Sequence, residues 1–323
     1  MKKILISVMV VIALCLWITG CDSGDEVVEP GEILEEETAG NEASVEVDGT
    51  VVVTDQMGRE VIISGVPQRI ISLSPSNTEI AFALGLADRI VGVTEFCNYP
   101  PEAMEKDIVG GFSTPSIEKI VELEPELILA STIHEEEVPR LEELGIPVLV
   151  IESSTLVELY TSMSLVAEVT GVIANGEALI ASMQERIAAV EAVVGSIEPG
   201  DRVSVYYEVY SDPLMSAGKG AFINEIITLA GGVNIFGDLE ENYPQVSAEY
   251  VAERQPDIIL FPDYHGTADF VLAGMTDRPG WESVPAVINN EVYAISDDAF
   301  ARPGPRVVDA VEEAAEIFYP ELF

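Results

Sequence analysis

Few side chains in this sequence could act as catalysts or metal ligands. The chain has 2 histidines, His134 and His265, whereas zinc and manganese sites need several imidazoles around one ion. No Gly-x-Ser-x-Gly, His-Glu-x-x-His or Cys-x-x-Cys motif occurs in the sequence. We expect His134, which precedes an acidic run, to be solvated. The sequence therefore argues against catalytic residues, a cofactor and a metal site.

Aromatic side chains, in contrast, follow many of the expected strands. Ligands of open α/β sheets bind beyond the carboxyl ends of the strands, so we expect these residues to line a binding site. Ring faces hold a large flat or bulky apolar ligand at low entropic cost, and they suit a bare ion poorly. The candidates for ligand contact are Phe96, Tyr99, Phe112, Tyr207, Tyr210, Tyr243, Phe300 and Arg302.

Short β-branched runs alternate with helical stretches, and these elements must position the candidates. In the first half we expect strands at 69–74, 89–94, 127–131 and 147–151. A capping box, with Ser76 as the N-cap and Glu79 three residues later, predicts the start of a helix that ends at Gly85. The β-α-β-α order predicts a parallel sheet with helices on both faces.

The same order returns in the second half of the chain. There we expect strands at 202–209, 258–261 and 292–295, and helices at 222–230 and 307–318. One unit repeats, because residues 116–129 align with residues 247–260 without a gap. At equivalent positions both copies have a Ser, two Glu, a β-branched residue, a Pro, an acidic residue and a final Ile-Leu. Each copy predicts a capped helix, a proline break and a buried strand. We therefore expect two copies of one α/β lobe that face each other across a cleft.

A single helix over 174–194 is expected to join the two lobes. Its apolar residues fall on one side, with charged residues outside that side. A helix of this length extends about 30 Å, at 1.5 Å per residue, which suits a rigid spine better than a loose linker. The expected boundaries are an N-terminal lobe at 51–172, a connecting helix at 173–198 and a C-terminal lobe at 199–323.

The start of the chain predicts export. Lys2 and Lys3 precede a mainly apolar run at 4–18, which is shorter than the roughly 20 residues that span a bilayer. We therefore expect a secretory signal peptide over 1–20. Ile18-Thr19-Gly20-Cys21 resembles the bacterial lipoprotein cleavage box, which implies cleavage before Cys21 and a lipid on its sulfur. An ordinary signal peptide followed by a chance Cys is the alternative.

Charge and cysteine content bound the mature protein further. Residues 22–48 hold 11 acids and no Lys or Arg, so we expect a disordered, extended tether over 21–50. The formal net charge of −42 argues against nucleic-acid partners, which need clustered Lys and Arg. Only Cys97 remains in the mature domain, which excludes an internal disulfide. We expect an extracytoplasmic monomer held at the membrane by lipid on Cys21.

Several motifs resemble those of a known family, the periplasmic binding proteins for vitamin B12, haem and ferric siderophores. The resemblance covers 69–323, and Asn98-Tyr99-Pro100-Pro101 and Tyr243-Pro244-Gln245-Val246-Ser247 are similar to the vitamin B12 branch. It implies an α/β fold of two Rossmann-like lobes joined by a long helix, with a ligand cleft between them. It also implies a binding protein, not an enzyme, that delivers a corrinoid to an ABC permease and its ATPase.

The resemblance also implies roles for particular residues. Glu118 and Glu249, which the repeat places at equivalent points, would be the surface carboxylates that dock on permease arginines. Both would equally suit the first turn of a helix, where the macrodipole favours an acid. Phe112 and Tyr243 fall where the vitamin B12 proteins have Trp, and Phe96 matches an aromatic of its loop. Arg302 could face an anionic ligand.

Two alternatives stay open at this point. The two departures from Trp leave the pocket aromatic but differently shaped, so haem or a ferric siderophore is possible, with iron bound by Tyr207, Tyr210 or Tyr264. A tetrapyrrole chelatase-like enzyme is an alternative of another class, because that chemistry also uses a cleft between two lobes. His265 would be its base.

Overall fold

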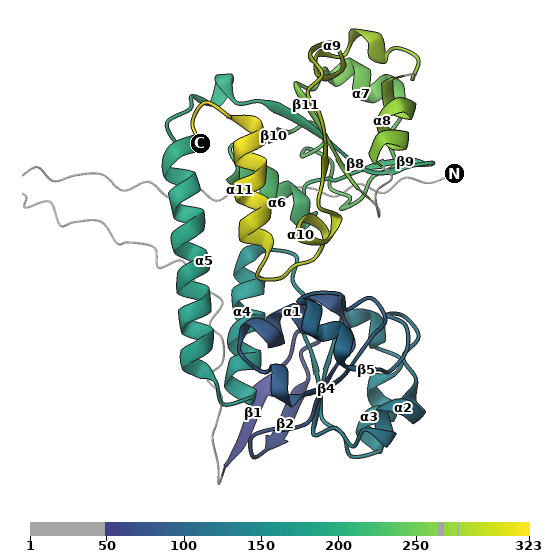
Figure 1. The fold of residues 1–323 in the computed structure, drawn as a ribbon, viewed down its shortest axis with the longest axis vertical. Coiled ribbons are helices and arrows are strands. Elements are labelled where there is room, and N and C mark those ends of the chain that lie inside the picture. The colour runs from purple at the N-terminus through teal and green to yellow at the C-terminus, as the bar shows by residue number, and fades with distance from the viewer. Residues whose placement is uncertain (1–48, 264–267, 277) are drawn as a thin grey trace, which may run out of the picture. The chain divides into compact units, whose positions relative to one another are not determined.

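The computed structural model describes residues 49–263, 268–276 and 278–323, which belong to one compact unit, Glu42–Phe323. Its helices and strands form two sheet-containing lobes connected along a long helix (Figure 1). The expected signal peptide, Cys21 and the tether up to residue 48 lie outside the described residues. The tether was predicted to reach residue 50, but strand β1 (Thr50–Thr54) already begins there.

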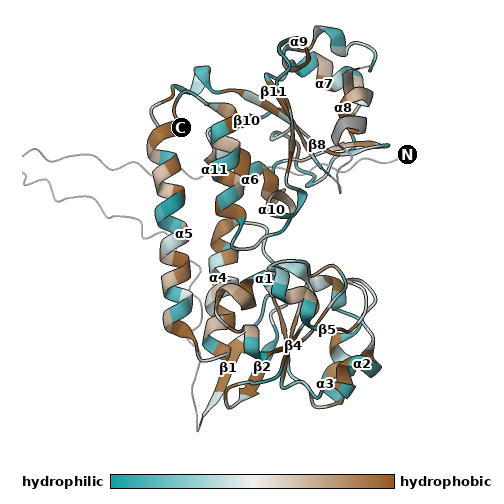
Figure 2. Ribbon diagram, in the orientation of Figure 1, coloured by the Kyte–Doolittle hydropathy of each residue, from teal (hydrophilic) through white to brown (hydrophobic). Residues whose placement is uncertain are grey.

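The N-terminal lobe contains a five-stranded parallel sheet in the order β5-β4-β3-β6-β7. Strands β3, β6 and β7 are buried throughout, as expected for a parallel sheet covered on both faces. Figure 2 shows the hydrophobic colouring of strand β4 in this sheet. The strands are β3 (Ile70–Ser72), β4 (Ile90–Val93), β5 (Asp107–Ile108), β6 (Leu127–Ala130) and β7 (Val148–Val150).

Helices cover this sheet, and one of them begins differently from the prediction. The N-cap of α1 is Ser74, whose side chain accepts a hydrogen bond from the Asn77 backbone, and Pro75 occupies the first helical position. Ser76 is therefore inside the helix, so the predicted capping box is wrong. The helices of this lobe are α1 (Pro75–Ala83), α2 (Ile117–Glu122), α3 (Val138–Glu143) and α4 (Leu156–Val169).

The C-terminal lobe repeats the arrangement with a parallel sheet in the order β10-β8-β11-β12, and β9 pairs antiparallel with β8. The strands are β8 (Ser204–Ser211), β9 (Leu214–Ser216), β10 (Val233–Asn234), β11 (Ile258–Pro262) and β12 (Val292–Ile295). The helices are α6 (Phe222–Leu229), α7 (Ala248–Arg254), α8 (Ala268–Thr276), α9 (Pro285–Asn289), α10 (Asp297–Ala301) and α11 (Val307–Phe318). The predicted fold class, two α/β lobes with parallel sheets, is confirmed.

The connecting helix is α5 (Ile173–Val194). It packs on α4 of the first lobe and on α11 of the second (Figure 1). Gly176 allows a close approach, because a Cβ there would lie 2.6 Å from the Ala167 methyl group. Arg186 of α5 pairs with Asp309 and Glu312 of α11. These contacts on both sides explain why the segment is a packed spine and not a free linker.

The internal repeat has the same local structure in both copies. Ser116 and Ser247 each cap a short helix by accepting a backbone hydrogen bond three residues later. Each helix is followed by a residue with positive φ, Glu124 at 46° and Gln255 at 48°, and then by a proline. The strands that follow, β6 and β11, are inner strands of their sheets. The sequence match therefore marks a structural repeat.

Some elements were absent from the sequence prediction. The antiparallel hairpin of β1 and β2 (Glu60–Ser64), the helix α4 and the two-residue strands β5 and β10 were not expected. Within the described part of the chain, no helix is both long enough and apolar enough to cross a membrane.

Candidate ligand-binding site

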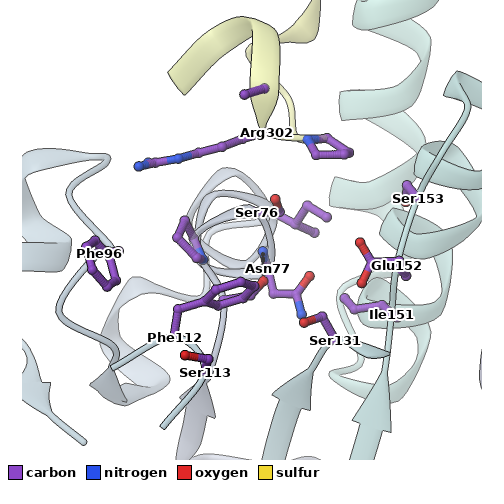
Figure 3. Close-up of a pocket in the computed structure, with 15 residues that line it drawn as sticks. Ser76, Asn77, Phe96, Phe112, Ser113, Ser131, Ile151, Glu152, Ser153 and Arg302 are labelled. Atoms are coloured by element: carbon purple, nitrogen blue, oxygen red, sulfur yellow. Dashed lines mark hydrogen bonds between the residues drawn. The ribbon is translucent and has the colours of Figure 1, made fainter. Parts of the chain in front are cut away.

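A cavity of about 470 Å³ lies between the two lobes. The N-terminal lobe lines most of it with residues beyond the carboxyl ends of β3, β6 and β7, namely Ser74, Ser131 and Glu152 among others. The C-terminal lobe contributes Ala301, the last residue of α10, and the two residues that follow it, Arg302 and Pro303. Figure 3 shows these groups around one space. The position agrees with the rule that parallel sheets bind ligands at their carboxyl edge.

The wall formed by the first lobe is rich in hydroxyl and amide groups that are already held in place. Asn77, which is 3% exposed, donates from its side-chain nitrogen to the Ala130 carbonyl at 2.9 Å. Ser153 Oγ lies 2.9 Å from Ser162 Oγ. Because these neutral groups are held before any ligand arrives, they could bind polar groups on a ligand at little entropic cost.

Phe112 is the aromatic residue most firmly fixed in the pocket. It sits in a tight turn where Gly110 has a φ of +127° and a Cβ would meet the Thr114 carbonyl at 2.7 Å, so the turn requires glycine. Its carbonyl oxygen lies 2.7 Å from Nε2 of His134. The two rings also pack edge to face, with centroids 5.6 Å apart.

His134 is buried, with 1% of its surface exposed, so its predicted solvation is wrong. The Ser131 backbone N–H donates to Nδ1 at 3.1 Å, which leaves the Nε2–H to donate to Phe112. Its hydrogen bonds join the segment after β6 to the turn after β5, whereas the acidic run that suggested exposure follows it in the chain. His134 therefore positions Phe112 and does not itself line the pocket.

Two further aromatic candidates of the first lobe behave differently from each other. Phe96 lines the pocket and is 55% exposed, so it has surface to offer a ligand. Tyr99 does not line this pocket but lines a neighbouring cavity, which Glu79 also lines. The Arg306 guanidinium lies 4.1 Å from the centroid of its ring, so Tyr99 packs against a charge that belongs to the other lobe.

The aromatic candidates of the second lobe mostly lie away from the pocket lining. Tyr207 of β8 and Phe300 of α10 are 1% and 0% exposed and belong to the lobe's core. Tyr207 is buried because β8 is an inner strand, covered on both faces. The structure therefore does not bring these two expected contacts to the cavity.

Tyr210 and Tyr243 are exposed on the second lobe. Tyr243 is still covered in part, and this partial burial, followed by the charge of Glu152, raises its pKa above the ordinary value for tyrosine. Glu152 belongs to the first lobe and lines the pocket. Tyr243 therefore stands close enough to the pocket for its titration to feel a carboxylate on the opposite wall.

Arg302 lines the pocket, but its positive charge is already paired with carboxylates. Its guanidinium lies 2.6 Å from Asp298 and 3.5 Å from Glu79, and it donates to Asn98 Oδ1 at 2.6 Å. Arg306 forms a two-pronged pair with Glu79, at 2.5 and 2.8 Å. Glu79 is in α1 of the first lobe, so this group of two acids and two arginines joins the lobes and has no net charge.

Glu118 and Glu249 occupy the first turn of α2 and of α7, and both are exposed. Hydrogen bonds from its own backbone N–H and from Ser247 hold the pKa of Glu249 below its ordinary value. Each is an acid at a helix start, two residues after the capping serine. The two carboxylates thus have the same setting in the two lobes.

The residues that sequence reasoning missed include Asn77, Ser131, Glu152 and Ser153. Glu152 and Ser153 directly follow the predicted strand 147–151, and Ser131 ends the predicted strand 127–131. The strand-end rule could therefore have found them if it had also been applied to these two strands. Within the part of the chain that the structure describes, no group of three or more His, Cys, Asp or Glu could hold a metal ion.

Comparison with known proteins adds to this geometry. Residues 70–299 match the family model described as periplasmic binding protein. The chain is 32% identical over 280 residues to the ABC transporter substrate-binding lipoprotein YvrC of Bacillus subtilis (strain 168), with 84% of this chain and 87% of that protein covered.

Two solved structures share the fold. The periplasmic vitamin B12-binding protein BtuF of Vibrio cholerae is 33% identical, with a TM-score of 0.68 and coverage of 79% of this chain and 97% of that one. The periplasmic haem-binding protein RhuT of Roseiflexus sp. RS-1 is 28% identical, with a TM-score of 0.70 and coverage of 78% and 98%. The fold is therefore common to proteins named for different tetrapyrrole-type ligands.

Proposed function

Because the chain belongs to the periplasmic binding protein family, we propose that it captures a corrinoid of the vitamin B12 type between its lobes and delivers it to an ABC importer. The protein is an extracytoplasmic substrate-binding component of ABC transport and not an enzyme. The family alone leaves the ligand open, so the corrinoid assignment depends on the pocket.

The observation that carries the proposal is the composition of the cavity between the lobes. Phe112 and Phe96 offer ring surface to a broad ligand, and the first lobe adds neutral hydroxyl and amide groups. A corrinoid presents a wide ring edged with amides, which such groups can match by hydrogen bonds. The 33% identity to the vitamin B12-binding protein of Vibrio cholerae supports the same assignment.

Haem and ferric siderophores are the competing ligands of the same class. The haem-binding protein of Roseiflexus has a similar fold, which supports haem as the alternative ligand. Haem carries two propionates, however, and the one arginine among the described pocket-lining residues is already paired with Glu79 and Asp298. The chelatase alternative required His265, which lies outside the described residues, and the family assignment replaces it.

Titration calorimetry tests the ligand directly. We expect the mature protein to bind cyanocobalamin more tightly than haemin or a ferric siderophore. Tighter binding of either competitor would move the assignment to that ligand. Failure to bind any of the three at high micromolar concentration would contradict the proposal as a whole.

The proposed delivery step uses Glu118 and Glu249. Charge pairs across an interface mainly set orientation and association rate, so we expect the double variant Glu118→Ala/Glu249→Ala to bind ligand normally and to transport poorly. The matched control is Glu185→Ala/Glu191→Ala, which removes two exposed acids of α5. Equal transport by both double variants would remove the docking role.

The proposed location is the outer side of the cell membrane, through lipid on Cys21. YvrC of Bacillus subtilis carries the word lipoprotein in its name and supports this arrangement. Cys21→Ala should release the protein from the membrane fraction while ligand binding persists. Continued membrane association of that variant would contradict the anchor.

A further inference from the structure

We propose that Glu152 makes the pocket selective for ligands without negative charge, so that it rejects anionic chelates that would otherwise fit. The inference rests on the proposed function, because it concerns the same pocket and names the charge class of its ligand. In this proposal Glu152 discriminates between ligands by their charge, whereas Phe112 and Phe96 discriminate between them by shape.

The first step is the charge balance around the cavity. Among the described residues that line it, Glu152 and Arg302 carry charge. Arg302 belongs to the neutral group in which it and Arg306 are matched by Glu79 and Asp298. A ligand anion that paired with Arg302 would have to compete with two carboxylates already in place. The pocket therefore offers an anion little attraction at its positive side.

Glu152, in contrast, has no cation to offset it within the described part of the chain. One of its oxygens, Oε2, accepts hydrogen bonds from the Thr132 backbone N–H at 3.3 Å and from Thr132 Oγ1 at 3.1 Å. Gln56 accepts a hydrogen bond from the Glu152 backbone. Hydrogen bonds therefore hold both the backbone and the carboxylate of Glu152, and Thr132, which donates to the carboxylate, is neutral.

The direction of the side chain follows from the fold. Glu152 comes two residues after the end of β7, between Ile151 and Ser153, which also line the cavity. Figure 3 shows its carboxylate on the pocket side of this segment. Its charge helps to raise the pKa of Tyr243 on the second lobe, after burial as the first cause. The field of this carboxylate therefore acts across the space between the lobes.

A negative charge fixed on the pocket wall repels an anion and is nearly indifferent to a neutral ligand. Because Glu152 is exposed, solvent screens part of this repulsion. Two like charges some 8–10 Å apart at an effective dielectric constant near 20 repel enough to change affinity by about twentyfold, and solvent screening of the exposed carboxylate reduces this to about tenfold. The effect should shrink as salt is added. Rejection of a wrong ligand by such a repulsive element is a common source of specificity.

The experiment compares ligands that differ in charge and hardly in shape. Cyanocobalamin is paired with a cobalamin monocarboxylate, in which one peripheral amide has become a carboxylate. Haemin is paired with haemin dimethyl ester, in which both propionates are blocked. For each pair, the ratio of dissociation constants for the anionic and the neutral member measures charge selectivity.

We expect the unmodified protein to favour the neutral member of each pair that it binds, and Glu152→Gln to reduce that preference by about tenfold. Glutamine keeps an oxygen that can accept the Thr132 hydrogen bonds, so the fold should be retained. Any change in affinity that is common to both members of a pair cancels in their ratio. Glu136→Gln, which removes an exposed charge of the same lobe that does not line the cavity, is the matched control.

The outcomes separate this inference from the proposed function. If cyanocobalamin does not bind but the haemin pair shows the Glu152-dependent ratio, the corrinoid proposal fails and the role of Glu152 stands. If cyanocobalamin binds and the ratio is the same in Glu152→Gln as in the unmodified protein, the role of Glu152 is refuted and the corrinoid proposal stands. Binding of neither pair overturns both.

Discussion

The two lobes share one repeated unit but contribute unequally to the pocket. In both, a serine caps a short helix, a residue with positive φ and a proline end it, and a buried inner strand follows. In the first lobe, residues beyond the ends of several strands line the cavity, whereas in the second the lining residues lie at the end of α10 and just after it. The repeat therefore builds the frame, and residues outside it determine what the frame can bind.

The difference also separates two kinds of side chain. The first lobe presents Phe96, Phe112 and Glu152 to the cavity. The second lobe buries Tyr207 and Phe300 in its core and sends Arg302 and Arg306 across to Glu79 of its partner lobe. Its main contribution is thus to hold the lobes together. Variants of each kind should have different effects, on stability for the second lobe and on affinity for the first.

The largest expected effect is on stability, from the pair that crosses between the lobes. Arg306→Ala leaves the Glu79 carboxylate, whose side chain is 2% exposed, without its two-pronged partner. We expect the free energy of unfolding to fall by about 3 kcal/mol, the usual result of breaking a buried pair. Urea unfolding followed by circular dichroism measures it.

Arg186→Ala is the control for that prediction, since its partner Asp309 is exposed and its partner Glu312 is only partly buried. Exposed pairs contribute up to about 1 kcal/mol, so this variant should be clearly more stable than Arg306→Ala. Equal losses in the free energy of unfolding would show that the pair between the lobes stabilises the fold no more than the pairs of Arg186 do.

The next effect is on affinity, from the aromatic wall of the first lobe. Phe112→Ala removes a ring that lines the cavity and should weaken cyanocobalamin binding by about thirtyfold, or roughly 2 kcal/mol. Tyr243→Ala, on the second lobe, should weaken it less, because Tyr243 is not among the lining residues. Calorimetric titration compares the two variants, and a greater loss for Tyr243→Ala would reverse the proposed division between the lobes.

A smaller effect is expected from the residue that positions Phe112. His134→Ala removes the hydrogen bond to the Phe112 carbonyl and should lower the free energy of unfolding by about 1–2 kcal/mol. It should also loosen the turn, which a Phe112→Trp reporter can follow by fluorescence anisotropy and quenching. His134→Gln, whose amide can donate to the same carbonyl, should restore part of the order. Unchanged anisotropy in the His134→Ala background would contradict the positioning role.

Residues in the core of the second lobe should affect affinity least. Phe300→Leu should cost about 1 kcal/mol of stability through imperfect packing and leave the dissociation constant for cyanocobalamin unchanged within error. A clear loss of affinity at unchanged stability would mean that Phe300 reaches the ligand after all.

The smallest effect is electrostatic and runs between the lobes. Glu152→Gln removes one of the two influences that raise the pKa of Tyr243, so that pKa should move down toward its ordinary value while burial keeps it above. Nuclear magnetic resonance of tyrosine labelled at Cζ follows the titration, with Tyr243→Phe to assign the signal. No change in the Tyr243 pKa would place Glu152 too far away to act on the opposite wall.

The framework of the fold followed from local patterns. The buried runs at 127–131 and 258–261, the capping serines Ser116 and Ser247, and the long amphipathic stretch over 174–194 all became the elements that they predict. Such features depend on near neighbours in the chain, so the sequence expresses them directly. The two-residue strands β5 and β10 were missed because they are too short to show a period.

The site depended on contacts between distant residues. Tyr207 and Phe112 both follow the same sequence rule, yet one is buried in an inner strand and the other is held at the cavity by His134. Glu79, which the sequence predicts as part of a capping box, pairs instead with Arg306, 227 positions later in the chain. By itself the sequence determined the two-lobed α/β frame, its repeat and its family resemblance. Only the tertiary structure decided which side chains face the cavity and which charges are cancelled, because both depend on long-range packing.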